Sequence, residues 1–218
     1  MPLMPKLCSM RRLMINFSFR FNPQSQALKR EVDSGTLGEI YFGRTVWRRC
    51  QGIPKLGGWF GKKELSGGGS LIDFGVHRLD LALWLMGYPE PEWAMGATYD
   101  PIAKRLAEEA GIDYSVEDIA VALIRFKNGA SRIVEASWAS HIAEKELMTT
   151  RILGSTAGLM QRNIAQGYEF EAELYLERGG SLFDMRLSST SPKTASSMEH
   201  LVDAIYESAD TGKLVRIG

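Results

Sequence analysis

Between residues 92 and 177 the sequence is a succession of short β-type segments separated by turn residues. The segments are rich in β-branched, aromatic and other apolar residues, which is typical of strands that cover a core. They span residues 92–99, 118–127, 130–139, 147–153, 157–162 and 168–177. Asn128-Gly129 joins two of them, and this dipeptide favours a tight hairpin because both residues readily take positive φ. Strands joined by such turns run antiparallel, so the sequence predicts an antiparallel sheet.

The predicted helices are few and lie outside this run of strands. Asn22 and Pro23 suit the N-cap and the first position of a helix that Gly35 ends. Residues 70–86 read as a buried helix that ends at Gly87. The remaining predicted elements are strands at 13–21 and 39–49 and a last helix at 197–211. This order predicts an α+β fold with an open, mostly antiparallel β-sheet and helices on one face.

The face of the sheet without helices is also expected to be partly apolar. The segment 130–139 carries apolar residues at both alternations, namely Ile133, Val134, Ala136 and Trp138. A sheet face that is apolar but not covered by helices indicates burial against another subunit. We therefore expect a homo-oligomer formed through the open sheet face.

The charge balance bears on the kind of partner. Lys and Arg total 26 and Asp and Glu total 26, so the formal net charge is zero. A neutral chain gives no electrostatic reason to expect nucleic acid or an acidic membrane surface as partner. Cys8 and Cys50 stand alone, without the spacing of a zinc site, which suggests a reducing compartment. With no signal-peptide pattern and no membrane-length apolar run, a cytoplasmic location is expected.

A glycine-rich loop leads into the segment that carries chemistry. Residues 50–69 contain seven glycines together with Trp59 and Phe60, so we expect this loop to pack or to contact a ligand. Three glycines ending at Gly69 precede the helix, where backbone can approach a ligand closely and free N–H groups point outward.

The side chains Asp73, His77, Asp80 and Trp84 are spaced i, i+4, i+7 and i+11 and so share one face of that helix. A carboxylate one turn before an imidazole can orient it and raise its pKa, which suits proton transfer near neutral pH. Alternatively, Ser70 and Asp73 form a helix cap and His77 is a core histidine bonded by Asp73 or a backbone carbonyl. Asp80 alternatively is a helix-face acid or a buried hydrogen-bonding group.

The same segment resembles a known family. GGGSLIDFGVHRLDLALWLMG is similar to the signature GGG-x-L-x-D-x-G-x-H-x-x-D of Gfo/Idh/MocA oxidoreductases. Further segments agree in order along the chain: INFSFRFNPQ with its Arg-Phe-x-Pro, VEDIAVALIRFKNGA with its Glu-Asp strand, and ILGSTAGL. The resemblance covers residues 13–218 and leaves residues 1–12 as an N-terminal extension.

The resemblance implies a C-terminal substrate and oligomerisation domain at residues 13–218. It also implies an NAD(P)-dependent oxidoreductase that acts on a CH–OH group of a sugar, polyol or similar substrate. Asp73 and His77 are then catalytic, with His77 as the acid/base on the hydroxyl while the nicotinamide exchanges hydride. The implied substrate-binding residues are Arg20, Trp59, Gly68 and Asp80. A structural ion pair is the alternative for Arg20, and packing is the alternative for Trp59.

The sequence departs from the family's pattern in one respect. It contains no G-x-G-x-x-G turn and no Glu-Lys-Pro segment, the marks of the family's Rossmann half. NAD or NADP is therefore expected in the intact enzyme, but we expect no cofactor to bind this chain alone, and we expect the chain alone to be inactive. A separate Rossmann domain becomes a possible partner, and the choice between NAD and NADP stays open.

Two other functions remain open on the sequence. One is a stand-alone module that binds a small ligand or mediates oligomerisation without catalysis. The other, ranked last, is a metal-dependent hydrolase that uses Asp73, His77, Asp80 and His141, because an Asp/His pair at i, i+4 can bind a divalent metal.

Overall fold

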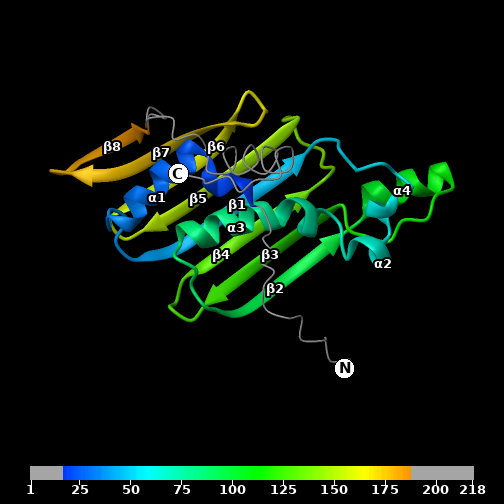
Figure 1. Cartoon of the computed structure of the whole chain (residues 1–218), viewed down its shortest axis with the longest axis horizontal. Helices are drawn as coiled ribbons and strands as arrows, with labels where there is room; N and C mark the ends of the chain where they lie inside the picture. Colours follow the sequence, from blue (N-terminus) through cyan, green and yellow to red (C-terminus); the bar gives the residue numbers. More distant parts are fainter. Residues whose placement is uncertain (1–16, 188–218) are drawn as a thin grey trace, which may run out of the picture.

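A computed structural model describes residues 17–187 of the chain. These residues form one eight-stranded sheet in the order β2-β3-β4-β1-β5-β6-β7-β8 (Figure 1). The strands are β1 (Ile40–Arg49), β2 (Pro91–Tyr99), β3 (Ile119–Phe126), β4 (Ser131–Ser137), β5 (Glu146–Gly154), β6 (Ala157–Ile164), β7 (Glu169–Arg178) and β8 (Ser181–Arg186). Neighbouring strands are antiparallel except β1 and β4, which pair in parallel. The sheet is therefore mixed but mostly antiparallel, and the predicted α+β class is confirmed.

The helices that position the site lie on one face of the sheet. α1 (Pro23–Asp33) packs on β6 and β7, and α3 (Val76–Leu85) packs on β1 and β5 (Figure 1). The side chain of Asn22 accepts a hydrogen bond from the backbone N–H of Gln24, which confirms the predicted N-cap of α1.

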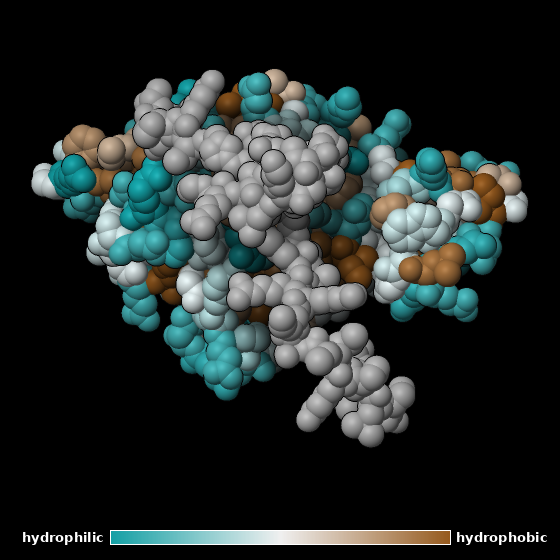
Figure 2. All heavy atoms as spheres, in the orientation of Figure 1, coloured by the Kyte–Doolittle hydropathy of each residue, from teal (hydrophilic) through white to brown (hydrophobic). Residues whose placement is uncertain are grey.

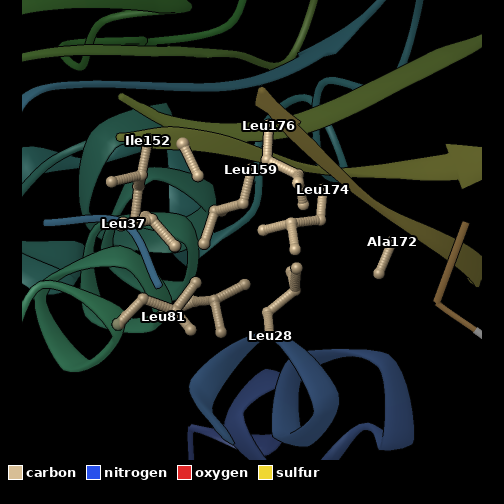
Figure 3. Packing of buried hydrophobic residues seen from close by; sticks show 10 residues of the cluster. Leu28, Leu37, Leu81, Ile152, Leu159, Ala172, Leu174 and Leu176 are labelled. Carbon is tan, nitrogen blue, oxygen red and sulfur yellow. The ribbon is translucent and has the colours of Figure 1, made fainter. Parts of the chain in front are cut away.

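Two apolar clusters hold these helices on the sheet. In the first, leucines of the helices meet leucines and an isoleucine of the central strands (Figure 3); its larger members are Leu28, Leu81, Leu85, Ile152, Leu159 and Leu174. The second lies under the segment that precedes α3 and is largely aromatic; it includes Trp47, Phe74, Trp138, Met148 and Phe170. Burying such side chains contributes roughly 1.5–3 kcal/mol each, so the start of α3 is fixed against the sheet.

The opposite face of the sheet exposes large apolar side chains. Leu123 pairs with Met95 on β2 and with Ile133 on β4, so these three residues share the face that points away from α3. On that face Met95 is 72% exposed and Leu123 is 38% exposed.

Some predicted elements differ from the structure. Residues 18–21 form a 3-10 helix, η1 (Ser18–Phe21), where a strand was predicted; the backbone turns here because Arg20 and the aromatic rings beside it pack against α3 instead of a neighbouring strand. The helices α2 (Lys63–Ser66) and α4 (Pro101–Ala110), the short 3-10 turn η2 (Trp59–Gly61) and strand β8 were not predicted. The predicted extension at 1–12 and the predicted helix at 197–211 lie outside the described residues.

α4 is held at the end of the sheet by Asp118, whose side chain accepts hydrogen bonds from the backbone N–H groups of Ile102 (2.9 Å) and Ala103 (2.8 Å). Figure 2 shows hydrophobic and hydrophilic residues intermixed at the end of the molecule that carries α2 and α4, where Leu65 is 64% exposed. Within residues 17–187, no helix has both the length and the apolar character needed to cross a membrane.

Candidate active site

The helix that carries the candidate catalytic residues begins at a carboxylate clamp. Glu117 accepts hydrogen bonds from the backbone N–H of Gly69 (2.9 Å) and of Leu71 (3.0 Å). A negative charge at this position also complements the partial positive charge of a helix N-terminus. The predicted cap formed by Ser70 and Asp73 is wrong: the Ser70 side chain makes no capping bond and donates instead to the carbonyl of Ala136 (3.1 Å).

Glycine at the start of this helix lets the backbone cross closely over the segment that carries Glu117. A Cβ on Gly69 would lie 2.0 Å from the carbonyl oxygen of Glu117, so no larger residue fits there. Gly67 has φ of +80° and ends α2 in the left-handed conformation that glycine favours. Gly68 accepts a hydrogen bond at its carbonyl from Ser66 Oγ (2.9 Å), and its role in substrate binding stays a prediction.

Asp73 lies in a π-helical turn, η3 (Leu71–Gly75), that runs directly into α3. Its Oδ2 accepts a hydrogen bond from the indole N–H of Trp138 at 2.8 Å. Because Trp138 is fully buried, this bond fixes where the half-buried carboxylate points. π-helical turns within α-helices are frequent at functional sites, because they shift side chains out of the regular spacing.

His77 lies one turn further on, among aromatic rings. Its ring centroid lies 5.6 Å from that of Phe17 and 6.0 Å from those of Phe19 and Trp47. The imidazole is half-buried, and its Nδ1 is buried without a hydrogen-bond partner among the described residues. His77 is therefore not a core histidine bonded by Asp73 or by a backbone carbonyl at this atom.

Burial lowers the pKa of His77, and the charges of Asp73 and Asp80 offset only part of that effect. Asp73 acts on this pKa in the predicted upward direction, but desolvation outweighs the attraction of the two carboxylates, so the net shift is downward. A lowered pKa leaves the imidazole neutral near pH 7. A neutral, half-buried imidazole can accept a proton from a hydroxyl group placed against it.

Arg20 and Asp80 form an ion pair beside the histidine. Arg20 Nε donates to Asp80 Oδ2 at 2.6 Å, and Arg20 Nη2 donates to the other carboxylate oxygen. Asp80 is 9% exposed, so the pair ties η1 to α3. The substrate-binding roles of Arg20 and Asp80 stay predictions, and any ligand would meet them as a paired group.

Trp59 is the exposed end of a chain of rings that reaches Asp73. Its side chain is 57% exposed and packs against Phe60, with centroids 4.0 Å apart and the ring planes tilted by 31°. Phe60 in turn contacts Trp138, at 6.3 Å between centroids. The substrate-binding role of Trp59 stays a prediction.

Several side chains around the site escaped the sequence analysis. Glu117 appeared only as part of a Glu-Asp strand, and no role was expected for Trp47, Trp138, Arg49, Glu146 or Tyr168. Trp47 stacks on Phe74 at 4.3 Å and donates from its indole N–H to Glu146. These partners are far apart in the sequence, so no spacing pattern could have shown them together.

A metal centre would need several ligands close together. In the part of the chain that the structure describes, no group of three or more His, Cys, Asp or Glu side chains could hold a metal ion. Asp80, one of the four residues of the hydrolase hypothesis, is bound by Arg20 instead.

A known protein family matches the part of the chain that contains this site. Residues 25–160 match the model of the GFO/IDH/MocA C-terminal domain, a range that includes the glycine run, Asp73, His77 and the Glu117 clamp. The chain belongs to the GFO/IDH/MocA family. The resemblance of the sequence to this family is thereby confirmed.

The relatives of this GFO/IDH/MocA chain include sugar dehydrogenases. It is 32% identical to D-glucoside 3-dehydrogenase of Escherichia coli (strain K12) over 94% of its own length. It is 26% identical to levoglucosan dehydrogenase of Pseudarthrobacter phenanthrenivorans over 79% of its length. The chain spans 64% of the first relative and 46% of the second.

Solved structures share the fold. An aldose-aldose oxidoreductase from Caulobacter crescentus, complexed with glycerol, superposes with a TM-score of 0.68 at 22% identity, covering 95% of this chain and 56% of that one. A levoglucosan dehydrogenase in complex with NADH gives a TM-score of 0.64 at 20% identity, covering 78% of this chain and 45% of that one. At these identities the likeness concerns the fold alone.

Proposed function

We propose that this chain is the substrate-side part of an NAD(P)-dependent oxidoreductase that oxidises a CH–OH group of a sugar or polyol. The observation that carries the proposal is the pair on the η3–α3 segment: Asp73 held by Trp138, and a half-buried His77 with a lowered pKa one turn away. The names of the relatives, which include a D-glucoside and a levoglucosan dehydrogenase, support the substrate class.

His77 is the proton acceptor in this proposal. Oxidation of an alcohol needs a base for the hydroxyl proton as hydride leaves the carbon, and a neutral imidazole meets that need. Asp73 stabilises the imidazolium that results, because its negative charge favours the protonated form of His77. Trp138 acts indirectly, by holding the Asp73 carboxylate in place.

The described residues do not fit a dinucleotide. The only helix start that follows a glycine run has two of its N–H groups bound to Glu117, so a carboxylate occupies the place that a phosphate would need. In the intact enzyme NAD or NADP would accept the hydride, carried by a Rossmann domain that packs against this one. The isolated chain is then expected to be inactive.

The open sheet face would join two copies of the chain. Trp93, Met95 and Tyr99 on β2 and Leu123 on β3 are exposed large side chains, and a second copy would remove them from water.

The proposal is tested with a fusion protein in which a Rossmann domain, taken from the part of the Escherichia coli relative that this chain does not cover, precedes residue 13. Reduction of NAD or NADP is followed with methyl glucosides, levoglucosan and inositols. We expect activity with at least one of these, and His77→Asn should lower kcat about 100-fold or more, as loss of an acid/base group does. His141→Asn, at an exposed loop position, is the matched control.

Two results would contradict the proposal. One is a fusion protein that folds and binds the nucleotide but oxidises none of the alcohols. The other is calorimetry showing micromolar NAD(P) binding by the isolated chain. This would contradict the proposal that a Rossmann domain carries the cofactor while this chain binds the substrate.

A further inference from the structure

A polar cluster outside the catalytic pair lies where β1 ends and β5 begins. It consists of Glu146, Arg49, Trp47 and Tyr168, and we call it the Glu146 cluster. Three donors converge on one carboxylate oxygen, Glu146 Oε1: the indole N–H of Trp47 (2.6 Å), Nε of Arg49 (2.8 Å) and the hydroxyl of Tyr168 (3.3 Å). Arg49 Nη2 also donates to the Tyr168 hydroxyl at 2.6 Å.

Only some polar atoms of the cluster have hydrogen-bond partners in the protein. Among residues 17–187, Glu146 Oε2 accepts no hydrogen bond, and Arg49 Nη1 donates none. Neither atom belongs to the side-chain atoms that are sealed from solvent without a partner. The Glu146 side chain is 8% exposed and that of Arg49 is 25% exposed, so each group keeps a solvent-accessible atom that the protein leaves open.

The cluster faces the same side of the sheet as the catalytic pair. Glu146 pairs with Arg49 across β1 and β5, and Trp47 lies two residues earlier on the same face. The centroid of the Trp47 ring lies 6.0 Å from that of His77 and 6.3 Å from that of Tyr168. Arg49 also lies over Phe74, at 4.4 Å from its centroid, and Phe74 follows Asp73 directly.

We propose that Glu146 Oε2 and Arg49 Nη1 bind a pair of adjacent hydroxyl groups of the substrate, beside the hydroxyl that His77 deprotonates. A carboxylate accepts a hydrogen bond from one hydroxyl, and a guanidinium donates to the oxygen of its neighbour. A vicinal diol supplies both groups, whereas a substrate with a single hydroxyl satisfies only one. This inference rests on the proposed function and narrows its substrate class to compounds with at least three hydroxyl groups.

A purely structural role would be a latch between the two strands and the turn that carries Tyr168. The three bonds to Oε1 suffice for a latch, because they already tie β1 and the turn to β5. They leave Glu146 Oε2 and Arg49 Nη1 without a partner among the described residues, although neither atom is sealed from solvent. Hydrogen bonds to charged groups are strong enough for these two to select a ligand.

The test is an NMR titration of the complete, ¹⁵N-labelled chain with methyl β-D-glucopyranoside. The indole N–H signal of Trp47 and the Nε–H signal of Arg49 should shift saturably, and tetrahydropyran, which has the ring without hydroxyls, should shift neither. Glu146→Gln should weaken the sugar's Kd about tenfold or more. Arg49→Lys keeps the charge but loses the planar pair of donors, and should weaken binding as well. Glu144→Gln, two residues earlier in the same loop, is the matched control.

The inference is overturned if the parent chain shows no saturable shift at the highest soluble sugar concentration, or if both variants fold and bind as the parent does. A thermal melt of each variant separates a loss of binding from a loss of fold. Sugar binding by the chain with no hydride transfer in the fusion protein would sink the proposed function alone. Hydride transfer with an unchanged KM in Glu146→Gln would sink only the role of the Glu146 cluster.

Discussion

At the scale of single residues, His77 is subject to two opposing effects. Aromatic rings remove water from its imidazole, which favours the neutral form, while Asp73 and Asp80 favour the cation. Burial is the larger effect, so the residue is a base ready to accept a proton at neutral pH.

The balance between desolvation and the two carboxylate charges at His77 can be measured directly. We expect NMR titration of the imidazole to place the pKa of His77 below its ordinary value, about 6.5. Asp73→Asn should lower it further, because the variant removes a negative charge while its amide oxygen can still accept from Trp138. Asp33→Asn, exposed on α1 and distant from the site, should leave it unchanged. A pKa above the ordinary value in the parent chain would show that the carboxylates dominate.

The same shift predicts how stability depends on pH. With its folded pKa lowered, His77 binds fewer protons in the folded than in the unfolded chain as the pH falls below about 6.5. His77 should therefore make the free energy of unfolding fall with acidification, from about pH 6.5 down to the folded pKa. Urea unfolding across this range should show a shallower pH dependence for His77→Gln than for the parent. Identical slopes would mean that the imidazole titrates alike in both states.

At the scale of elements, the start of the η3–α3 segment depends on a neighbouring segment and not on its own residues. The Glu117 carboxylate supplies the cap, and the Glu117 backbone crosses so close that position 69 cannot carry a side chain. The π-helical turn that follows then brings Asp73 to Trp138.

Two adjacent glycines provide a matched test of this arrangement. In Gly69→Ala the new Cβ would lie 2.0 Å from a backbone oxygen, so the crossing must open at a cost of about 1–3 kcal/mol or more. In Gly68→Ala the nearest atom is Ile72 Cγ2 at 3.4 Å, an ordinary contact, and the φ angle is not positive. Chemical denaturation should show a large loss of stability for the first variant and little change for the second. Equal losses of stability in the two variants would contradict the close approach of the Glu117 backbone to Gly69.

At the scale of the whole molecule, the two faces of the sheet differ in what they carry. One face carries α1, α3 and the candidate active site, and the other exposes apolar side chains of β2 and β3. The exposed apolar side chains lie on β2 and β3, whereas α3 packs on β1 and β5, so a second copy on the open face would leave the site accessible.

The proposed pairing of two copies is tested at Leu123. Leu123→Lys should weaken self-association about tenfold or more, because it places a charge in the centre of the apolar face. Leu65→Lys, which changes an exposed leucine of α2 instead, should leave association unchanged. Sedimentation velocity over a range of concentrations measures both. A parent chain that stays monomeric at every concentration would remove the basis of this pairing.

The sequence by itself determined what depends on neighbouring residues. Alternation and turn chemistry sufficed for most strands and for the Asn128-Gly129 hairpin, and Asn22 and Pro23 marked the start of α1. The motif around Asp73 and His77 sufficed for the family. Strand β8 escaped because its six residues carry only a weak alternation. The helix α4 was missed although its sequence carries helix signals, with Pro101 at the start, Ala103 and Ala107 on the buried face and Gly111 at the end.

Only the tertiary structure decided which distant groups meet. The parallel pairing of β1 and β4 and the bonds of Glu117 to Gly69, of Trp138 to Asp73 and of Glu146 to Arg49 each join residues that are far apart in the chain. Local pattern carries no information on such pairs, because they depend on the order of strands in the sheet. The direction of the His77 pKa shift belongs here too, since desolvation exists only once the rings of other elements have closed around the imidazole.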